Sequence, residues 1–326
     1  MIARVGTTGS REPTVDEPIQ PRRRRSLWKR FRRATRGPRN AVLARAIWGV
    51  GRAVGALPPP AALAVGRALG GGAHALLGTP RRLALRHVGM AFPELDEAAR
   101  ARIVRATFEH AGQSFVELGS WRRIAHDSGY VIGNFEVLDE ALGEGRGTIA
   151  ITGHVGNWEL LAATVAERGY GLSVVARRVN DARFDALITR FRGDRGMEIL
   201  VRDAPDFLAQ VRAALGRGHI VAILMDQDSR GAGVFVPFFG RSAHTPPGAA
   251  VLALRTRAPV VTVFIRRRPG GGHVITFERV SIDYGAGRGQ LTALTARFTA
   301  AIEAAIRLSP AEWVWWHERW RRQPDA

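Results

Sequence analysis

The sequence predicts an α/β fold with a mixed central sheet flanked by helices. From about residue 131 onward, short apolar runs alternate with longer helical patterns, the rhythm of strand–helix–strand units. The chain has 326 residues, of which 46% are hydrophobic, enough to fill the core of one large domain or two smaller ones. There is no internal repeat.

The expected strands are short, apolar and rich in β-branched residues. They are Thr148 to Ile151, Leu172 to Ala176, Glu198 to Val201, Ile220 to Met225, Val260 to Ile265 and His273 to Glu278. The expected helices lie between or after them. They are Trp158 to Arg168, Phe184 to Arg195, Ala204 to Leu215, Pro247 to Arg257 and Leu291 to Leu308.

Residues 1–40 are predicted to be a disordered basic arm. Within it, residues 21–39 hold ten basic side chains and no acid, out of a formal net charge of +19. Each basic residue near an anionic membrane contributes about 1 kcal/mol, so the arm suits a membrane surface. The alternative is a solvated, flexible arm.

Residues 41–80 are predicted to be a membrane-associated helical hairpin, followed by the α/β domain over residues 81–326. Arginines interrupt the apolar segment, so no spanning helix is expected. A cleavable signal peptide is not expected either, because the apolar stretch begins too late behind the basic arm. A hairpin packed on the main domain is compatible with this prediction. The chain has no cysteine, which excludes disulfides, thiolate metal sites and a cysteine nucleophile, and suits a cytosolic-facing protein.

The strongest candidate site is Thr152-Gly153-His154-Val155-Gly156-Asn157-Trp158-Glu159. Five helical steps would leave His154 and Glu159 about 140° apart. We therefore place His154 on the turn after a strand and Glu159 in the next helix, where its carboxylate can reach back to the ring. A histidine oriented in this way is a general base for a hydroxyl group. The alternatives are a buried structural histidine and a first-turn acid favoured by the helix dipole.

Asn157 is expected to cap the helix that begins near Trp158, and to line the substrate site. Free backbone amides at that helix start are candidate donors to an oxyanion.

Two acids follow another apolar strand, at Asp226 and Asp228. Carboxyl ends of neighbouring strands gather the sites of α/β sheets, and His154, Arg178 and Asp226 would all fall there. We expect Asp226 and Asp228 either to bind substrate or to position other residues of the site. The alternative is that they belong to a structural turn. Two carboxylates without a third ligand do not make a metal site, so no metal is predicted.

These residues carry a family resemblance. The run TGHxGNWE resembles the H-x4-D/E signature of glycerolipid acyltransferases, in the form found in the late acyltransferases of bacterial lipid A biosynthesis. Further segments agree in the same order from about residue 41 to 322. They are Ala91-Phe92-Pro93-Glu94, Arg178-Val179-Asn180-Asp181, Asp226-Gln227-Asp228, Val234 to Gly240, and Pro310 to Arg319. His87 and the arginine-rich arm depart from the family pattern.

The resemblance implies an O-acyltransferase on the cytoplasmic face of the cell inner membrane, bound peripherally or monotopically. It would move a fatty acyl chain from acyl carrier protein, or coenzyme A, to a hydroxyl of a lipid A precursor, an anionic glycolipid. No cofactor is implied. Arg178, at the family's Arg-x-Asn-Asp position, would bind phosphate or the oxyanion, although Arg177 lies beside it. An apolar groove would accept the acyl chain.

Three alternatives remain open. The acceptor can be another lipid, such as a phosphatidylinositol mannoside, or water, in which case the enzyme is a hydrolase. A nucleic-acid-binding role is disfavoured, since half of the net charge lies in the arm and no such motif is present. The C-terminal tryptophans Trp313, Trp315, Trp316 and Trp320, mixed with basic residues, predict either an interfacial surface or core packing. His219 and His244 are taken as structural.

Overall fold

The computed structural model describes residues 49, 53–54, 56–120, 124, 129–177, 189–190, 192–228, 231–284 and 289–324. The chain divides into two units, Met1–Leu43 and Ala44–Ala326, and all described residues belong to the second. The predicted basic arm, and most of the first half of the predicted hairpin, lie outside the described residues.

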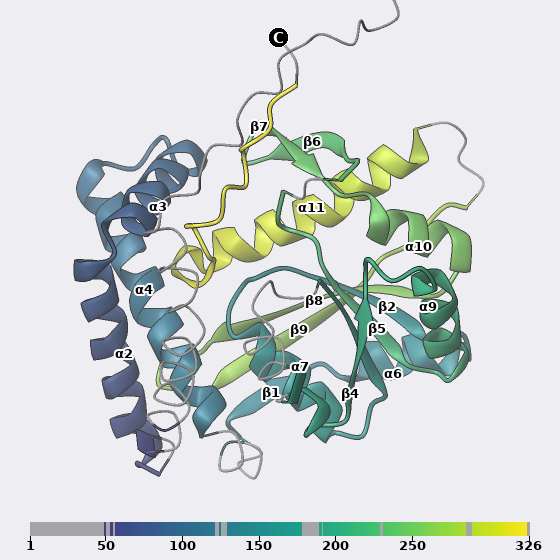
Figure 1. Ribbon diagram of the computed structural model, residues 1–326, viewed down its shortest axis with the longest axis horizontal. Coiled ribbons are helices and arrows are strands. Elements are labelled where there is room, and N and C mark those ends of the chain that lie inside the picture. Colours follow the sequence, from purple (N-terminus) through teal and green to yellow (C-terminus); the bar gives the residue numbers. More distant parts are fainter. Residues whose placement is uncertain are drawn as a thin grey trace, which may run out of the picture. The chain divides into compact units, whose positions relative to one another are not determined.

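A seven-stranded mixed sheet forms the centre of the fold, as the sequence predicts (Figure 1). Its order is β1-β9-β8-β2-β5-β3-β4. Neighbouring strands run parallel except β8 and β9, which are antiparallel. The bounds are β1 Val131–Gly133, β2 Thr148–Thr152, β3 Leu172–Ala176, β4 Met197–Val201, β5 Ile220–Leu224, β8 Val260–Arg267 and β9 His273–Arg279.

Helices cover both faces of this sheet because successive apolar side chains of its strands point to opposite faces. Ile149 and Ile151 of β2 face one core, and Ala150 faces the other. The first core is closed by α9 (Phe207–Gly216), α10 (Gly248–Thr256) and α11 (Gln290–Leu308). The second core is closed by α6 (Glu136–Gly143) and α7 (Trp158–Glu167). The three-layer arrangement buries the sheet completely at its centre.

In the described part of the chain that precedes the sheet, three helices lie together at one side of it (Figure 1). They are α2 (Pro59–Leu76), α3 (Gly78–Ala91) and α4 (Glu97–Gly119). α2 packs closely on α4 through glycines: a Cβ on Gly70 would lie 2.1 Å from the carbonyl oxygen of Phe108. The second half of the predicted hairpin is therefore packed on the α/β domain. No helix in the described part of the chain is long and apolar enough to cross a bilayer.

A small hairpin of β6 (Val234–Phe238) and β7 (Arg241–Thr245) was not among the predicted strands. Its two turn residues, Phe239 and Gly240, both have positive φ angles, of 52° and 68°. Positive φ at both positions is typical of a type I′ turn, for which Asn-Gly is the usual sequence signal. Because Phe239 takes the position of the usual asparagine, the hairpin was not predicted from the sequence.

The C-terminal tryptophans belong mainly to the core. Trp313, Trp315 and Trp320 are buried, and the ring of Trp313 packs edge to face with Phe238 of the hairpin and with the other two indoles. The core-packing alternative is thus correct for these three. Trp316 is partly buried and lies against Phe108 of α4.

Candidate active site

The site begins where two adjacent parallel strands end together. Thr152 of β2 lies in register with Leu224 of β5. His154 and Asp226 each follow two residues later, so the register that pairs the strands also brings these two side chains together. Gly153 lets the strands' ends approach, since a Cβ there would lie 3.2 Å from the Asp226 carboxyl carbon.

Asp226 holds His154 through two hydrogen bonds. The ring Nδ1 lies 2.8 Å from Asp226 Oδ1, and the backbone amide of His154 donates to Oδ2 at 2.9 Å. The indole of Trp313 donates to the same Oδ2 at 2.8 Å. With Asp226 ionised, Nδ1 carries the ring proton and Nε2 is left with its lone pair. A base is thereby presented in one tautomer.

Burial opposes the ionisation of Asp226, which is 2% exposed. The His154 ring and the hydrogen bonds from His154 and Trp313 outweigh this effect and hold the pKa of the carboxyl well below its usual range. Asp226 therefore remains a carboxylate at physiological pH. It can stabilise the imidazolium that forms when His154 takes a proton.

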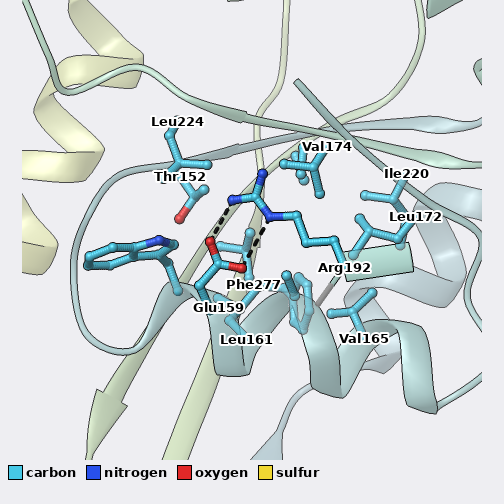
Figure 2. Close-up of a pocket in the computed structure, with 15 residues that line it drawn as sticks. Thr152, Glu159, Leu161, Val165, Leu172, Val174, Arg192, Ile220, Leu224 and Phe277 are labelled. Carbon is cyan, nitrogen blue, oxygen red and sulfur yellow. Dashed lines mark hydrogen bonds and ion pairs between the residues drawn. The ribbon is translucent and has the colours of Figure 1, made fainter. Parts of the chain in front are cut away.

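Glu159, which we expected to orient the ring, binds elsewhere. Its carboxylate accepts two hydrogen bonds from the Arg192 guanidinium, at 2.5 and 3.2 Å (Figure 2). The expected Glu159–His154 contact is wrong because α7 directs Glu159 into the second core. There Arg192 offers a bidentate partner, while Asp226 already occupies Nδ1.

The Glu159–Arg192 pair lies across an apolar cavity beneath α7 (Figure 2). The cavity measures about 30 Å³ and is lined by the inner faces of α7 and of the central strands. Its apolar lining includes Leu161, Val165, Leu172, Val174, Ile220, Leu224 and Phe277. This ion pair is the polar boundary of an otherwise hydrocarbon-like space.

Asn157 caps α7, as predicted: its Oδ1 accepts from the amide of Leu160 at 3.2 Å. Its Nδ2 donates to Glu117 of α4 at 2.9 Å and approaches the carbonyl of Ser114 at 3.3 Å. The side chain is buried and engaged at both ends. Asn157 therefore fixes the turn that carries His154, and its expected contact with substrate stays a prediction.

Asp228 has structural partners, and its contact with substrate stays a prediction. Its buried carboxylate accepts from the Arg322 guanidinium at 2.7 Å and lies 3.1 Å from Nδ1 of His244. Asp228 links the C-terminal segment to the β6–β7 hairpin, because its carboxylate contacts Arg321 and Arg322 of that segment and His244 of β7. Arg178 lies outside the described residues. No group of three potential metal ligands occurs in the described part of the chain.

Two residues beside the His154 ring were missed as site residues. Gln227 Nε2 lies 3.2 Å from His154 Nε2 and 2.8 Å from His317 Nδ1. The rings of His154 and His317 are 5.3 Å apart and nearly perpendicular. Gln227 stands between the two predicted acids, and His317 follows the tryptophan run. Their nearness to His154 depends on how the C-terminal segment folds back on the sheet.

The turn after His154 is held by the same C-terminal segment. Val155 bridges Trp313, and the amide of Gly156 donates to the Glu312 carbonyl at 2.8 Å. Gly156 has φ 65°, and a Cβ there would lie 1.9 Å from the Ile265 carbonyl oxygen. Glycine is required at this position by both its conformation and its space.

The chain is similar to known proteins over most of its length. Residues 28–322 match the family described as bacterial lipid A biosynthesis acyltransferase. The chain is 29% identical over 281 residues to the lipid A biosynthesis lauroyltransferase of Escherichia coli K12, covering 83% of this chain and 88% of the relative. It is 23% identical over 274 residues to the lipid A biosynthesis palmitoleoyltransferase of the same organism, covering 82% and 87%.

A second group of relatives has a different name. The phosphatidylinositol mannoside acyltransferase of Mycobacterium tuberculosis H37Rv is 26% identical over 202 residues. The match covers 61% of this chain and 62% of that relative, so the chain spans under two thirds of its length. Because the family match covers nearly the whole described unit, this chain is an acyltransferase of the lipid A or related glycolipid type and belongs to the bacterial lipid A biosynthesis acyltransferase family.

Proposed function

We propose that the chain transfers a fatty acyl group from a thioester of acyl carrier protein, or of coenzyme A, to a hydroxyl of a lipid A precursor, with His154 as general base. The observation that carries the proposal is the Asp226–His154 pair. It leaves Nε2 of a neutral imidazole as proton acceptor, backed by a carboxylate that stays ionised. Asp226 takes the orienting role that the sequence assigned to Glu159.

The reaction has two steps. The acceptor oxygen attacks the thioester carbonyl carbon, forming the new C–O bond while its proton passes to His154 Nε2 and the carbonyl oxygen becomes an oxyanion. The tetrahedral intermediate then collapses, the C–S bond breaks, and the proton on Nε2 passes to the departing thiolate. This resembles the logic of a serine triad, with a substrate hydroxyl in place of the serine.

The apolar cavity beneath α7 is our candidate for the acyl-chain site. It lies next to the helix that follows His154, and each buried CH₂ would contribute about 0.8 kcal/mol. An acyl chain needs more room than 30 Å³, so the side chains around the cavity must separate when it binds. Glu159 and Arg192 would then affect the binding of the acyl chain and would have no direct role in proton transfer.

The outer face of α2 and the turn to α3 form a surface suited to an anionic membrane. Leu69, Leu76 and Leu77 are 46, 85 and 48% exposed. Residues 18–93 contain no Asp or Glu, while Arg67, Arg81 and Arg82 lie on or just beyond α2. An apolar face within a positively charged segment favours the interface with anionic lipid.

Aromatic contacts connect this surface with the site. His74 of α2 packs on Phe108 of α4, and Phe108 packs on Trp316. Trp316 adjoins His317, whose ring faces His154. A series of packed aromatic rings therefore runs from α2 to the residue next to His317. We propose peripheral or monotopic attachment to the cytoplasmic face of the inner membrane, where an acidic carrier protein would also meet a basic enzyme.

The second candidate acceptor is a phosphatidylinositol mannoside, favoured by the similarity to mycobacterial enzymes with that name. The chemistry at His154 would be the same for either acceptor.

The test measures transfer of radiolabelled acyl chains from acyl carrier protein to a tetra-acylated lipid A precursor in detergent, with phosphatidylinositol mannoside as a parallel acceptor. Wild type, His154→Ala and His219→Ala are compared, and folding is checked by circular dichroism. His219 lies at the opposite end of β5, against Ser173, and is the matched control. We expect activity in wild type and the control and loss in His154→Ala. Full activity in His154→Ala would exclude the mechanism.

A further inference from the structure

A second imidazole, that of His317, lies beside the ring of His154, with ring centroids 5.3 Å apart, and is carried on a rigid segment. His317 follows Trp313 and Trp315, both fully buried. Trp313 binds Asp226 through its indole, so the carboxylate that orients His154 also anchors the segment that carries His317. The backbone of His317 is fixed at both groups, with its amide donating to Val314 O and its carbonyl accepting from the amide of Arg319.

The amide of Gln227 sets the tautomer of His317, because its nitrogen lies 2.8 Å from His317 Nδ1 and donates to it. The same nitrogen lies 3.2 Å from Nε2 and 3.3 Å from Nδ1 of His154. The tautomer of His154 is set by Asp226, to which Nδ1 donates. With Nδ1 of His317 accepting, a neutral His317 carries its proton on Nε2.

His317 is neutral over the physiological range. Burial, reinforced by the neighbouring His154 ring, lowers its pKa to about 4. The pair of histidines therefore has complementary roles by construction. His154 presents a lone pair, and His317 presents an N–H donor on a ring that faces it.

The proposed reaction requires such a donor, because the carbonyl oxygen of the thioester becomes negatively charged in the intermediate. The backbone amides around the turn cannot all supply it. The amide of His154 donates to Asp226, that of Gly156 donates to Glu312 O, and that of Leu160 donates to Asn157. At the helix start that the sequence suggested as an oxyanion site, the amide of Leu160 is therefore already engaged.

We propose that His317 is a catalytic residue whose Nε2–H donates to the oxyanion of the tetrahedral intermediate, with Gln227 as the positioning residue that holds its tautomer. The proposal rests on the proposed acyl transfer. The bond forms as negative charge develops on the carbonyl oxygen and is released when the C–S bond breaks. His317 keeps its proton throughout, so the proton balance of the reaction is unchanged. A neutral imidazole suits this role, since it polarises the carbonyl without competing with His154 as a base.

Kinetic comparison of His317→Phe and His317→Gln tests the catalytic role. Phenylalanine keeps the ring shape without a donor, and glutamine restores a donor. Loss of one oxyanion donor costs about 10²–10³-fold in kcat. We expect that loss in His317→Phe with little change in KM, and partial recovery in His317→Gln. His219→Phe, a remote replacement of the same kind, is expected to leave kcat unchanged. A kcat for His317→Phe within about threefold of wild type, or a loss confined to KM, would overturn the proposal.

A second measurement does not depend on the acceptor. ¹⁵N NMR of histidine-labelled protein reports which ring nitrogen carries the proton, and His317→Phe assigns the signal. We expect His317 protonated on Nε2 at pH 7, and a mixture of tautomers in Gln227→Leu. A proton on Nδ1 would overturn the proposal while leaving the proposed acyl transfer standing. Absence of transfer by wild type to every acceptor tested would instead refute the proposed function.

Discussion

Asp226 forms two hydrogen bonds with His154: one carboxylate oxygen accepts from the ring Nδ1 and the other from the backbone amide of the same residue. The ring and its backbone are thus fixed by a single side chain from the adjacent strand. Trp313 shares the second oxygen, so the C-terminal segment is part of the same unit. The base is positioned by three segments of the chain that meet at one buried carboxylate.

The first prediction concerns the charge and acceptor capacity of Asp226. In Asp226→Asn, an amide cannot accept from the ring, the His154 amide and the Trp313 indole together. If its NH₂ faces the ring, Nδ1 must accept and Nε2 takes the proton, which abolishes the base. The analogous change in a serine protease lowers kcat by about 10⁴, and we expect a loss of that order. Acyl transfer kinetics measure it, and thermal unfolding shows that the fold remains. Activity within tenfold of wild type would contradict the assignment.

The second prediction separates Glu159 from the base. The Glu159–Arg192 pair is largely buried, with side chains 17 and 13% exposed. Removing one partner leaves an unpaired charge against an apolar cavity, so Glu159→Met or Arg192→Met should each lose about 3 kcal/mol of unfolding free energy. The double variant should recover most of that loss, since it leaves a fully apolar cavity.

A double-mutant cycle in urea measures this coupling. Additive losses would show that the ion pair does not stabilise either side chain. With the fold restored in the double variant, residual acyl transfer is expected, because the Asp226–His154 pair is intact. Complete loss of kcat in a stable double variant at saturating acyl donor would return a direct catalytic role to Glu159.

The sequence predicted the sheet more fully than the site, and the reason is physical. Parallel central strands are continuous apolar runs, so β2, β3, β5 and β8 could be found from composition alone. The three-residue β1 carries too little pattern, and the hairpin turn has Phe239 where asparagine is usual before its glycine. His154 could be found because a strand, two glycines and a capping asparagine surround it.

The partner of His154 was assigned wrongly, because proximity in the sequence favoured Glu159 over Asp226, which lies 72 positions away. The register of β2 and β5 decides the matter: it pairs Thr152 with Leu224 and thereby places Asp226 beside His154. Strand pairing was not predicted, although both residues were placed at carboxyl ends of strands. Gln227 and His317 depend on the same tertiary information.

The third prediction tests the membrane surface. Leu76→Glu combined with Leu77→Glu places two acids on the exposed turn between α2 and α3 and should weaken binding to vesicles of phosphatidylethanolamine and phosphatidylglycerol at least tenfold. Leu208→Glu on α9, also an exposed leucine but at the opposite side of the fold (Figure 1), is the control. Vesicle co-sedimentation measures binding, and activity on detergent-dispersed substrate should persist. Equal binding by all three proteins would refute this surface.

The fourth prediction concerns the packing of α2 on α4. A Cβ on Gly70 would lie 2.1 Å from a backbone oxygen of α4, whereas one on Gly72 would have nothing within 4 Å. Gly70→Ala must push the helices apart and should lose about 3 kcal/mol of unfolding free energy. Gly72→Ala should gain up to about 1 kcal/mol from helix propensity. Urea unfolding compares the two. Equal stability would mean that α2 is not closely packed on α4.

The last prediction follows from the buried carboxyl of Glu312, whose backbone carbonyl binds Gly156 in the catalytic turn. Burial raises its pKa to about 7, against an ordinary value of 4.5. Between pH 4.5 and 7 the folded protein retains a proton that the unfolded chain has released, so the unfolding free energy falls as pH rises through this range. Glu312→Gln lacks this titration. Its stability relative to wild type should rise by up to about 3 kcal/mol across the window.

His110, 3.9 Å from Glu312, has the opposite effect. Burial lowers its pKa to about 3, so its imidazole adds stability with rising pH between pH 3 and 6.5, in which the unfolded chain binds the extra proton. His110 is present in both proteins, and its contribution largely cancels in their difference. Urea unfolding of wild type and Glu312→Gln at several pH values from 4.5 to 7.5 isolates the Glu312 titration. Parallel stability curves would show that Glu312 titrates at its ordinary pKa and that the carboxyl reaches water.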